Sequence, residues 1–531
     1  MRGLEARTCS ALSTAVLAVI PLVLAGGTVT MYRAIVPIRA GTGGYDYDPA
    51  YAYLLNGIGV IQGHTPGHID HPGTPMQVLV GVIAYLKRAL AALFEVPAKD
   101  FNRAVLADPE QYLWAVSVTL LLLNATAIGY LGHRIHFASG SLLLALLAQS
   151  CFGLLGKLMP RLLYVSPEAL VIFAVALATA RLADVWFSND GAIPNVSGLA
   201  VSTAFFLALS ATAKITSLPL VLLLATIPTR RAKIAGAISF LVFSLIFLSP
   251  VFSKLLSIWT RWLGIFQHSG KFGTGPQDII DLEKVMPRLA SLAEHQPLLF
   301  VSIAASCLVA IIGVVRHQRR TAVCGVVLVG TQLTQLLMVL KHFGRHYTIP
   351  SLTLAPLVLA WSLRRSLGDL VGRRSEAVAA GLGLLLVLRV LVMDSQAYLD
   401  QLRLADRDRN RDLQRMSAVI GAYPDAVVVG AYRVRNEGFA LHFGLGYVQG
   451  RFQRELSRSL AQPLSYSRWN GMLFSPQQGW LPLSHLNTII DRGQVVLMVL
   501  PDDLTLSGIQ GKTLLEIPGQ ERIVKVDAVA P

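Results

Sequence analysis

The stretch from Pro297 to Val315, PLLFVSIAASCLVAIIGVV, contains no charged residue. A helix of about 20 apolar residues spans the roughly 30 Å hydrocarbon core of a bilayer, so this stretch is long enough to cross a membrane. Comparable apolar blocks recur along the chain, at residues 11–32, 112–133, 139–157, 163–186, 197–213, 215–229, 234–250, 297–315, 321–340, 346–363 and 376–393. The pattern predicts an all-α polytopic membrane domain of about 11 transmembrane helices.

The composition supports this fold class and divides the chain in two. Hydrophobic residues make up 53% of the sequence and charged residues 15%, whereas a soluble domain carries about 25% charged residues. No long apolar block follows Met393, so we expect a membrane domain over residues 1–393 and a soluble domain over residues 394–531. A helix through 396–421 and strands near 426–431, 494–500 and 513–528 predict that the second domain is a small α/β unit.

The net charge of +15 does not indicate a nucleic-acid partner. The basic runs of the chain lie between apolar blocks, as at residues 229–233, and this placement is typical of cytoplasmic loops in membrane proteins. They also lack the clustered aromatic residues of a strand-binding groove. The four cysteines form no Cys-x-x-Cys pair, so the sequence does not indicate cysteine chemistry.

The placement of residues 75–96, PMQVLVGVIAYLKRALAALFEV, decides the topology. The segment is long enough to span, but Lys87 and Arg88 lie in its middle, each costing about 2.5–3.5 kcal/mol at a bilayer centre. If it lies in the interface, the basic connections all share the cytoplasmic side with the N-terminus; if it spans, they all face outward. The positive-inside rule therefore favours an interfacial amphipathic helix within one large external loop, residues 33–111.

We therefore expect a multi-pass protein of the cell (inner) membrane, oriented as the positive-inside rule favours. Arg2 and Arg7 precede the first apolar run, and this run extends past the possible cleavage region at residues 24–27, which favours an uncleaved signal anchor with a cytoplasmic N-terminus over a cleaved signal peptide. The C-terminal domain is then external or periplasmic. The connections around residues 158–166, Lys214, 251–296 and 341–347 fall on the external face as well.

The first external loop holds the densest polar sequence. Asp46 and Asp48 stand two positions apart, and the run from His64 to Pro75, HTPGHIDHPGTP, adds three histidines and Asp70. Together these residues could form a proton-transfer or cation site. Alternatively, Asp48 followed by Pro is a good helix N-cap, and the histidines, including His71, are solvated loop residues whose spacing permits a zinc site without requiring one.

A second cluster, Lys341 to Tyr347 (KHFGRHY), places four potentially cationic side chains at an external helix junction. Such a group suits an anion such as phosphate, for which Arg345 offers a bidentate fork, with Lys341 and His346 beside it. The alternative is that these side chains extend to lipid headgroups. Positive charge is disfavoured on the external side, which favours a functional role. Glu168, at an external helix start, is a further candidate, unless it serves only the helix N-terminus.

Five short elements resemble the GT-C superfamily of membrane glycosyltransferases, in its protein-mannosyltransferase and aminoarabinose-transferase-like branch. Asp48 to Tyr51 resembles that branch's Asp-Glu-Ala-x-Tyr motif, with Pro in place of Glu and Tyr one position early. His71 to Gly73 resembles a His-Pro-Pro element, with Gly as its last residue. Elements similar to Arg-x-x-Pro-Asp, Leu-Thr-Lys-Gly and Arg-Tyr-x-x-Pro follow in the same order, at residues 166–170, 211–215 and 345–350.

The resemblance covers roughly residues 11–393 and implies a hexosyl or pentosyl transferase. Its donor is a sugar linked to polyprenyl phosphate, and its acceptor is a glycan, lipid or protein on the external face. The resemblance implies Asp48 as general base, with Asp46 as the alternative, because the attacking group must lose a proton. It implies that Arg345, with Lys341 and His346, binds the donor phosphate.

The same resemblance adds Asp70, His71, Glu168 and Lys214 as further residues of the cavity. A divalent metal is possible because some family members bind one in the first loop. Pro49 replaces the motif's Glu here, so neither the metal nor its ligands are fixed by the sequence.

Two other classes compete with a transferase. A lipid or solute transporter would place ionisable residues at mid-membrane, often in repeated halves, whereas these blocks have nearly uncharged centres and no repeat. A non-catalytic membrane assembly subunit would carry the same external domain, but substitutions in its polar clusters would have no effect on chemistry.

The topology can be tested by cysteine accessibility. Single cysteines at Asp70, Arg103 and Arg451, in a protein freed of its native cysteines, are all expected to react with a membrane-impermeant reagent from the external side. Labelling of position 103 from the cytoplasm alone would make residues 75–96 a spanning helix and contradict the arrangement.

Overall fold

The computed structural model describes residues 2–35, 50–69, 73–94, 100–187, 195–267 and 282–431, and residues 441–530 with short gaps. Eight helices are long and apolar enough to cross a membrane by length and composition, which makes the chain a multi-pass membrane protein. These spans are Ser13–Arg33, Thr74–Ala92, Pro109–Ser139, Pro167–Trp186, Val196–Ala213, Arg230–Gly264, Pro297–Val315 and Arg319–Lys341.

The contacts group the described chain into two compact units. The first contains Met1–Thr30, Ile69–Met76 and Ser117–Ala397, and the second contains Met31–His68, Gln77–Val116 and Tyr398–Pro531. Most of the segment predicted to be the first external loop therefore packs with the C-terminal residues rather than by itself. The predicted division of the chain at residue 394 stays a prediction.

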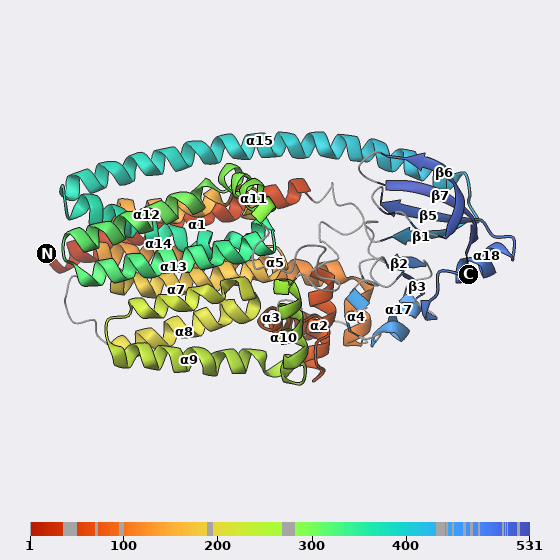
Figure 1. Cartoon of the computed structure of the whole chain (residues 1–531), viewed down its shortest axis with the longest axis horizontal. Helices are drawn as coiled ribbons and strands as arrows, with labels where there is room; N and C mark the ends of the chain where they lie inside the picture. Colours follow the sequence, from red (N-terminus) through yellow and green to blue (C-terminus); the bar gives the residue numbers. More distant parts are fainter. Residues whose placement is uncertain are drawn as a thin grey trace. The chain divides into compact units, whose positions relative to one another are not determined.

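The first unit is a helical bundle (Figure 1). Its shorter apolar elements are η3 (Cys151–Leu162) and η4 (Ile215–Thr226), and the turn η7 (Arg345–Thr348) leads into α14 (Ile349–Leu363). The remaining helices are α1 (Arg2–Ile35), α5 (Pro109–Ser139), α6 (Leu142–Ser150), α7 (Pro167–Trp186), α8 (Val196–Ala213), α9 (Arg230–Leu248), α10 (Leu255–Gln267), α11 (Leu282–His295), α12 (Pro297–Val315) and α13 (Arg319–Lys341).

Small residues let α12 and α13 pack closely. A Cβ added at Gly313 would lie 2.2 Å from the backbone nitrogen of Ala322, and one at Gly325 would lie 2.5 Å from that of Ala310. Such close backbone approach is how transmembrane helices associate where lipid removes the hydrophobic driving force. The two helices thus form a tight hairpin that carries the turn η7 at its end.

Arginines from other helices satisfy the C-terminal carbonyls of α7. Arg320 donates to the Val185 carbonyl at 2.6 Å, and Arg365 donates to the Trp186 carbonyl at 3.3 Å. The indole of Trp361 also donates to the Trp186 carbonyl, at 2.8 Å. A helix end needs such partners because its last carbonyls have none within the helix. Basic residues of the predicted cytoplasmic connections therefore hold the bundle together.

The second unit contains a seven-stranded sheet in the order β4-β3-β2-β1-β5-β7-β6. Strand β1 pairs in parallel with β2 and β5, and the other pairs are antiparallel. The end of α15 (Arg373–Gly421) covers one face and α18 (His485–Ile490) the other. The strands are Val427–Ala431, Ser465–Ser467, Met472–Ser475, Gly479–Leu481, Val496–Pro501, Ile509–Glu516 and Glu521–Val529, from β1 to β7.

The described residues of the predicted first external loop pack against a C-terminal segment within this unit. Helix α2 (Ala52–Ile61) crosses α3 (Thr74–Ala92) at Gly57, where an added Cβ would lie 2.7 Å from the Gln77 carbonyl oxygen. A Cβ at Gly67 would lie 1.5 Å from the carbonyl oxygen of Tyr447, so this contact requires glycine. Helix α4 (Phe101–Ala107) contacts α17 (Gln453–Ser459) in the same unit.

The fold class predicted from the sequence is confirmed: the predicted apolar blocks are largely helical, and an α/β sheet domain follows. Eight candidate spans lie in the described residues and seven of them overlap the 11 predicted blocks, so the number of 11 transmembrane helices stays a prediction. The blocks at 376–393 and 396–421 form one continuous helix, α15, of 49 residues. The strand expected at 513–528 is the hairpin of β6 and β7. Residues 74–92 form a helix as expected, and by length and composition it is able to span, so its interfacial position stays a prediction.

Candidate functional site

The first unit contains a buried ion pair between Lys214 and Glu168. Lys214 follows the last residue of α8 in extended conformation, and only 2% of it is exposed. Glu168 lies in the first turn of α7, directly after Pro167, and is 3% exposed. The Lys214 amine donates a hydrogen bond to Glu168 Oε1. A buried charge requires such a partner, so the pair ties two helix ends together.

The turn η7 adds two aromatic side chains to this pair. His346 Nε2 lies 3.7 Å from Glu168 Oε1, and the rings of His346 and Tyr347 are 4.2 Å apart. The Lys214 amine lies 4.4 Å from the centre of the Tyr347 ring, within range of a cation–π interaction. Glu168, Lys214, His346 and Tyr347 are called the Lys214 cluster below.

Burial sets the protonation of the groups outside the spans. It lowers the pKa of the Lys214 amine, although the Glu168 carboxylate opposes this shift. Burial also lowers the pKa of His346 to about 3; Lys214 reinforces the shift and Glu168 opposes it. His346 is therefore neutral near pH 7 and can donate or accept a hydrogen bond without adding charge.

Arg345 and Lys341 belong to the same connection, but Arg345 is directed elsewhere. Its guanidinium donates to the Ser291 hydroxyl of α11 at 3.2 Å. Its carbonyl accepts hydrogen bonds from the Gln296 amide at 2.8 Å and the Thr348 hydroxyl at 2.7 Å. Lys341 is the last residue of α13 and is buried. The structure thus brings together Glu168, Lys214 and His346, and holds Arg345 against α11.

Several residues around the cluster carry no signal in the sequence motifs. The hydroxyls of Ser166, Thr216 and Ser217 are buried beside Glu168 and Lys214, and have no hydrogen-bond partner among the described residues. Tyr347, Gln296 and Gln335 were not identified as functional residues because single aromatic and amide side chains at helix ends usually only pack or cap. Only their tertiary contacts distinguish them.

The predicted residues of the first loop cannot be placed. Asp46, Asp48, Asp70 and His71 lie outside the described residues, so their roles stay predictions. His68 is described: its ring lies 5.1 Å from that of Tyr53 and 4.7 Å from that of Tyr447, in aromatic packing. No group of three His, Cys, Asp or Glu side chains in the described part of the chain is arranged to hold a metal ion.

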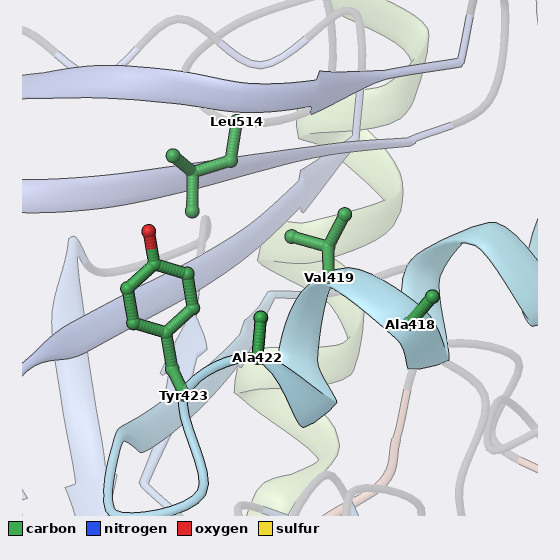
Figure 2. A pocket seen from close by; sticks show the side chains of 5 residues that line it. All are labelled: Ala418, Val419, Ala422, Tyr423 and Leu514. Atoms are coloured by element: carbon green, nitrogen blue, oxygen red, sulfur yellow. The ribbon is translucent and has the colours of Figure 1, made fainter.

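A separate cavity of about 360 Å³ lies in the C-terminal domain (Figure 2). Its lining consists of Ala418, Val419, Ala422, Tyr423 and Leu514, from the end of α15 and from β6. Apart from the Tyr423 hydroxyl, these side chains offer no polar group. The cavity therefore lacks the convergent polar groups of a catalytic site.

Comparisons with known proteins find similarity in structure but not in sequence. Neither a protein-family model nor a curated protein matches the sequence significantly. The structure is similar to a crystal structure of ArnT from Cupriavidus metallidurans bound to undecaprenyl phosphate, with 12% identity and a TM-score of 0.46 over 96% of this chain and 97% of that one. The same protein in the apo state gives 12% identity and 0.46 over 99% of each chain. At that TM-score the likeness decides neither fold nor function.

The neutral state of the partly buried His346 makes stability depend on pH. Its pKa of about 3 in the folded protein lies below the ordinary value of 6.5, so the unfolded chain binds more protons between these values. The contribution of His346 to folding is complete above pH 6.5 and is lost as the pH falls toward 3. We expect His346→Gln to weaken the fall in melting temperature over this range, measured in detergent, while His64→Gln, at an exposed position, keeps the wild-type profile.

Proposed function

We propose that the chain is a glycosyltransferase that moves a sugar from a polyprenyl-phosphate donor to an acceptor on the external face of the membrane. One observation carries this proposal. Three sequence elements that resemble GT-C motifs, at 166–170, 211–215 and 345–350, are distant along the chain, yet Glu168, Lys214 and His346 from them converge in one cluster around a buried ion pair. An accidental set of motif matches would not be expected to meet in space.

The Lys214 cluster is suited to stabilising the leaving group of the reaction, the lipid phosphate. When the sugar transfers, the bond between its anomeric carbon and the phosphate oxygen breaks, and negative charge develops on the phosphate. A preorganised cation in a dry site stabilises such charge more than one in water. In the proposed site Lys214 supplies this cation, and Glu168 keeps it charged and in place before the donor arrives.

Arg345, Lys341 and His346 complete the proposed phosphate site. Arg345 offers a planar fork that matches two phosphate oxygens, which an ammonium group cannot do. Its present hydrogen bond goes to the neutral hydroxyl of Ser291, which a phosphate oxygen would outcompete as an acceptor because it is charged. His346, neutral near pH 7, contributes a hydrogen bond.

The attacking side of the reaction is assigned to the first external loop. Asp48 takes the proton from the acceptor's hydroxyl or amine as its oxygen or nitrogen attacks the anomeric carbon, and Asp46 is the alternative base. Asp70 and His71 are proposed as further residues of this side of the reaction. A divalent metal remains compatible with this loop chemistry, and no step proposed here depends on one.

Sugar transfer by isolated membranes tests the function and the base together. Membranes containing the protein and supplied with radiolabelled polyprenyl-phosphate sugars are expected to transfer one of the labels to an acceptor. Asn caps a helix as well as Asp does, so Asp48→Asn should fold normally, yet it should lower the rate by about 10²–10⁴ if Asp48 is the base. Full activity of this variant would reassign the base, and Asp46→Asn is the matched comparison. Donor binding without any transfer would instead favour a lipid transporter.

The proposed phosphate site predicts that substitutions of Arg345 raise the donor KM in a definite order. Arg345→Lys keeps the charge but loses the fork and should raise the KM for the donor, and Arg345→Ala should raise it further. Ser291→Ala is the control, because it removes only the resting partner of the guanidinium and should leave the donor KM near wild type. If both Arg345 variants keep the wild-type KM, Arg345 does not bind the phosphate, and the proposed site is left with Lys214 and Lys341 as its cations.

A further inference from the structure

Gln335 lies where several helices meet. It belongs to none of the sequence motifs and has no part in the proposed chemistry. It is on α13 and is 1% exposed. Its side-chain nitrogen donates to the Thr216 carbonyl at 3.1 Å and to the Tyr347 carbonyl at 3.3 Å. Its side-chain oxygen accepts a hydrogen bond from Ser351 of α14. The amide therefore connects four elements: α13, η4, η7 and α14.

Two of these contacts lie next to the Lys214 cluster. Thr216 is two residues after Lys214, in the first turn of η4, and Tyr347 is the residue whose ring lies against the Lys214 amine. By holding the Thr216 and Tyr347 carbonyls on one nitrogen, Gln335 sets the distance between the segment that carries Lys214 and the segment that carries His346. These carbonyls need a donor because an unpaired buried carbonyl is costly.

We propose that Gln335 is a positioning residue that fixes the geometry of the Lys214 cluster. Its amide is suited to this role because it supplies two N–H donors on a neutral group, whereas a charged side chain would disturb the neighbouring ion pair. Glutamate would lose both donors, and methionine would keep the length but lose every hydrogen bond. The expected effect on sugar transfer rests on the proposed function, but the effect on the cluster does not.

Gln332, three residues earlier on the same helix, is a matched control. It is also buried, and its amide donates to the Ser306 hydroxyl of α12 at 2.9 Å, away from the Lys214 cluster. Gln332→Met and Gln335→Met each remove a buried amide from α13, but Gln335 makes three hydrogen bonds whereas the side-chain oxygen of Gln332 has no partner among the described residues, so Gln332→Met should lower the melting temperature less. A difference between the two variants beyond stability therefore reports on the cluster.

The first measurement is the titration of His346, followed by NMR of histidine-labelled protein. The charged and titratable groups that act on His346 are Lys214, Glu168, Arg161 and His342, so a shift of the η7 turn changes its surroundings. In wild type and in Gln332→Met the pKa of His346 should stay near 3, whereas Gln335→Met should raise it by at least one unit toward 6.5. Signals are assigned by their loss in His346→Gln. Equal pKa values in the two methionine variants would overturn the proposal.

The second measurement is sugar transfer with the donor identified above. A misplacement of about 1 Å can cost about 10²-fold in rate, so Gln335→Met should lower kcat by about that factor while Gln332→Met stays near wild type. Gln335→Asn, one methylene shorter, is the milder variant if Gln335→Met does not fold, and should show the same changes in smaller degree. If no donor is transferred by the wild type, the proposed function fails, but the titration still decides the role of Gln335.

Discussion

The buried ion pair of Lys214 and Glu168 is the constraint on which the site in the helical unit depends. Removing two charges from water is costly, and their attraction offsets that cost only with good geometry and further hydrogen bonds. The pair therefore requires the end of α8 and the start of α7 to meet, and it draws the η7 turn against them through His346 and Tyr347. In the proposed reaction the same cost becomes useful, because an anion entering the cluster meets a cation that is already desolvated and oriented.

The sequence predicts the helices well because a membrane leaves few alternatives. Backbone groups in hydrocarbon must be satisfied internally, so a long apolar block such as 297–315 becomes a helix whatever its neighbours. The soluble domain lacks this constraint. Its three short strands β2 to β4 have only three or four residues each and show no clear alternation. The hairpin of β6 and β7 was predicted as one strand although Pro518-Gly519 marks a turn.

Three of the four residues of the Lys214 cluster could be predicted from the sequence, but their arrangement could not. Glu168, Lys214 and His346 were each identified from a motif or a charge in an unfavourable place, since such residues stand out against an apolar sequence. Their pairing is a contact between helix ends far apart in the chain, which local patterns do not contain. Gln335 gave no signal, because a single amide in an apolar helix has no periodicity and its partners are backbone carbonyls that every residue has.

The need to satisfy the backbone also explains why amides surround a charged cluster. The segments η4 and η7 are 3₁₀ helices of 12 and 4 residues, whose carbonyls are not all paired within the segment. Where water is excluded, each such carbonyl needs a donor from another element. Gln296 provides it for Arg345, and Gln335 provides it for Thr216 and Tyr347. The amides that satisfy these carbonyls also fix the separation of η4 and η7. The positions of Lys214 and His346 therefore follow from the same requirement that allows the two segments to be buried.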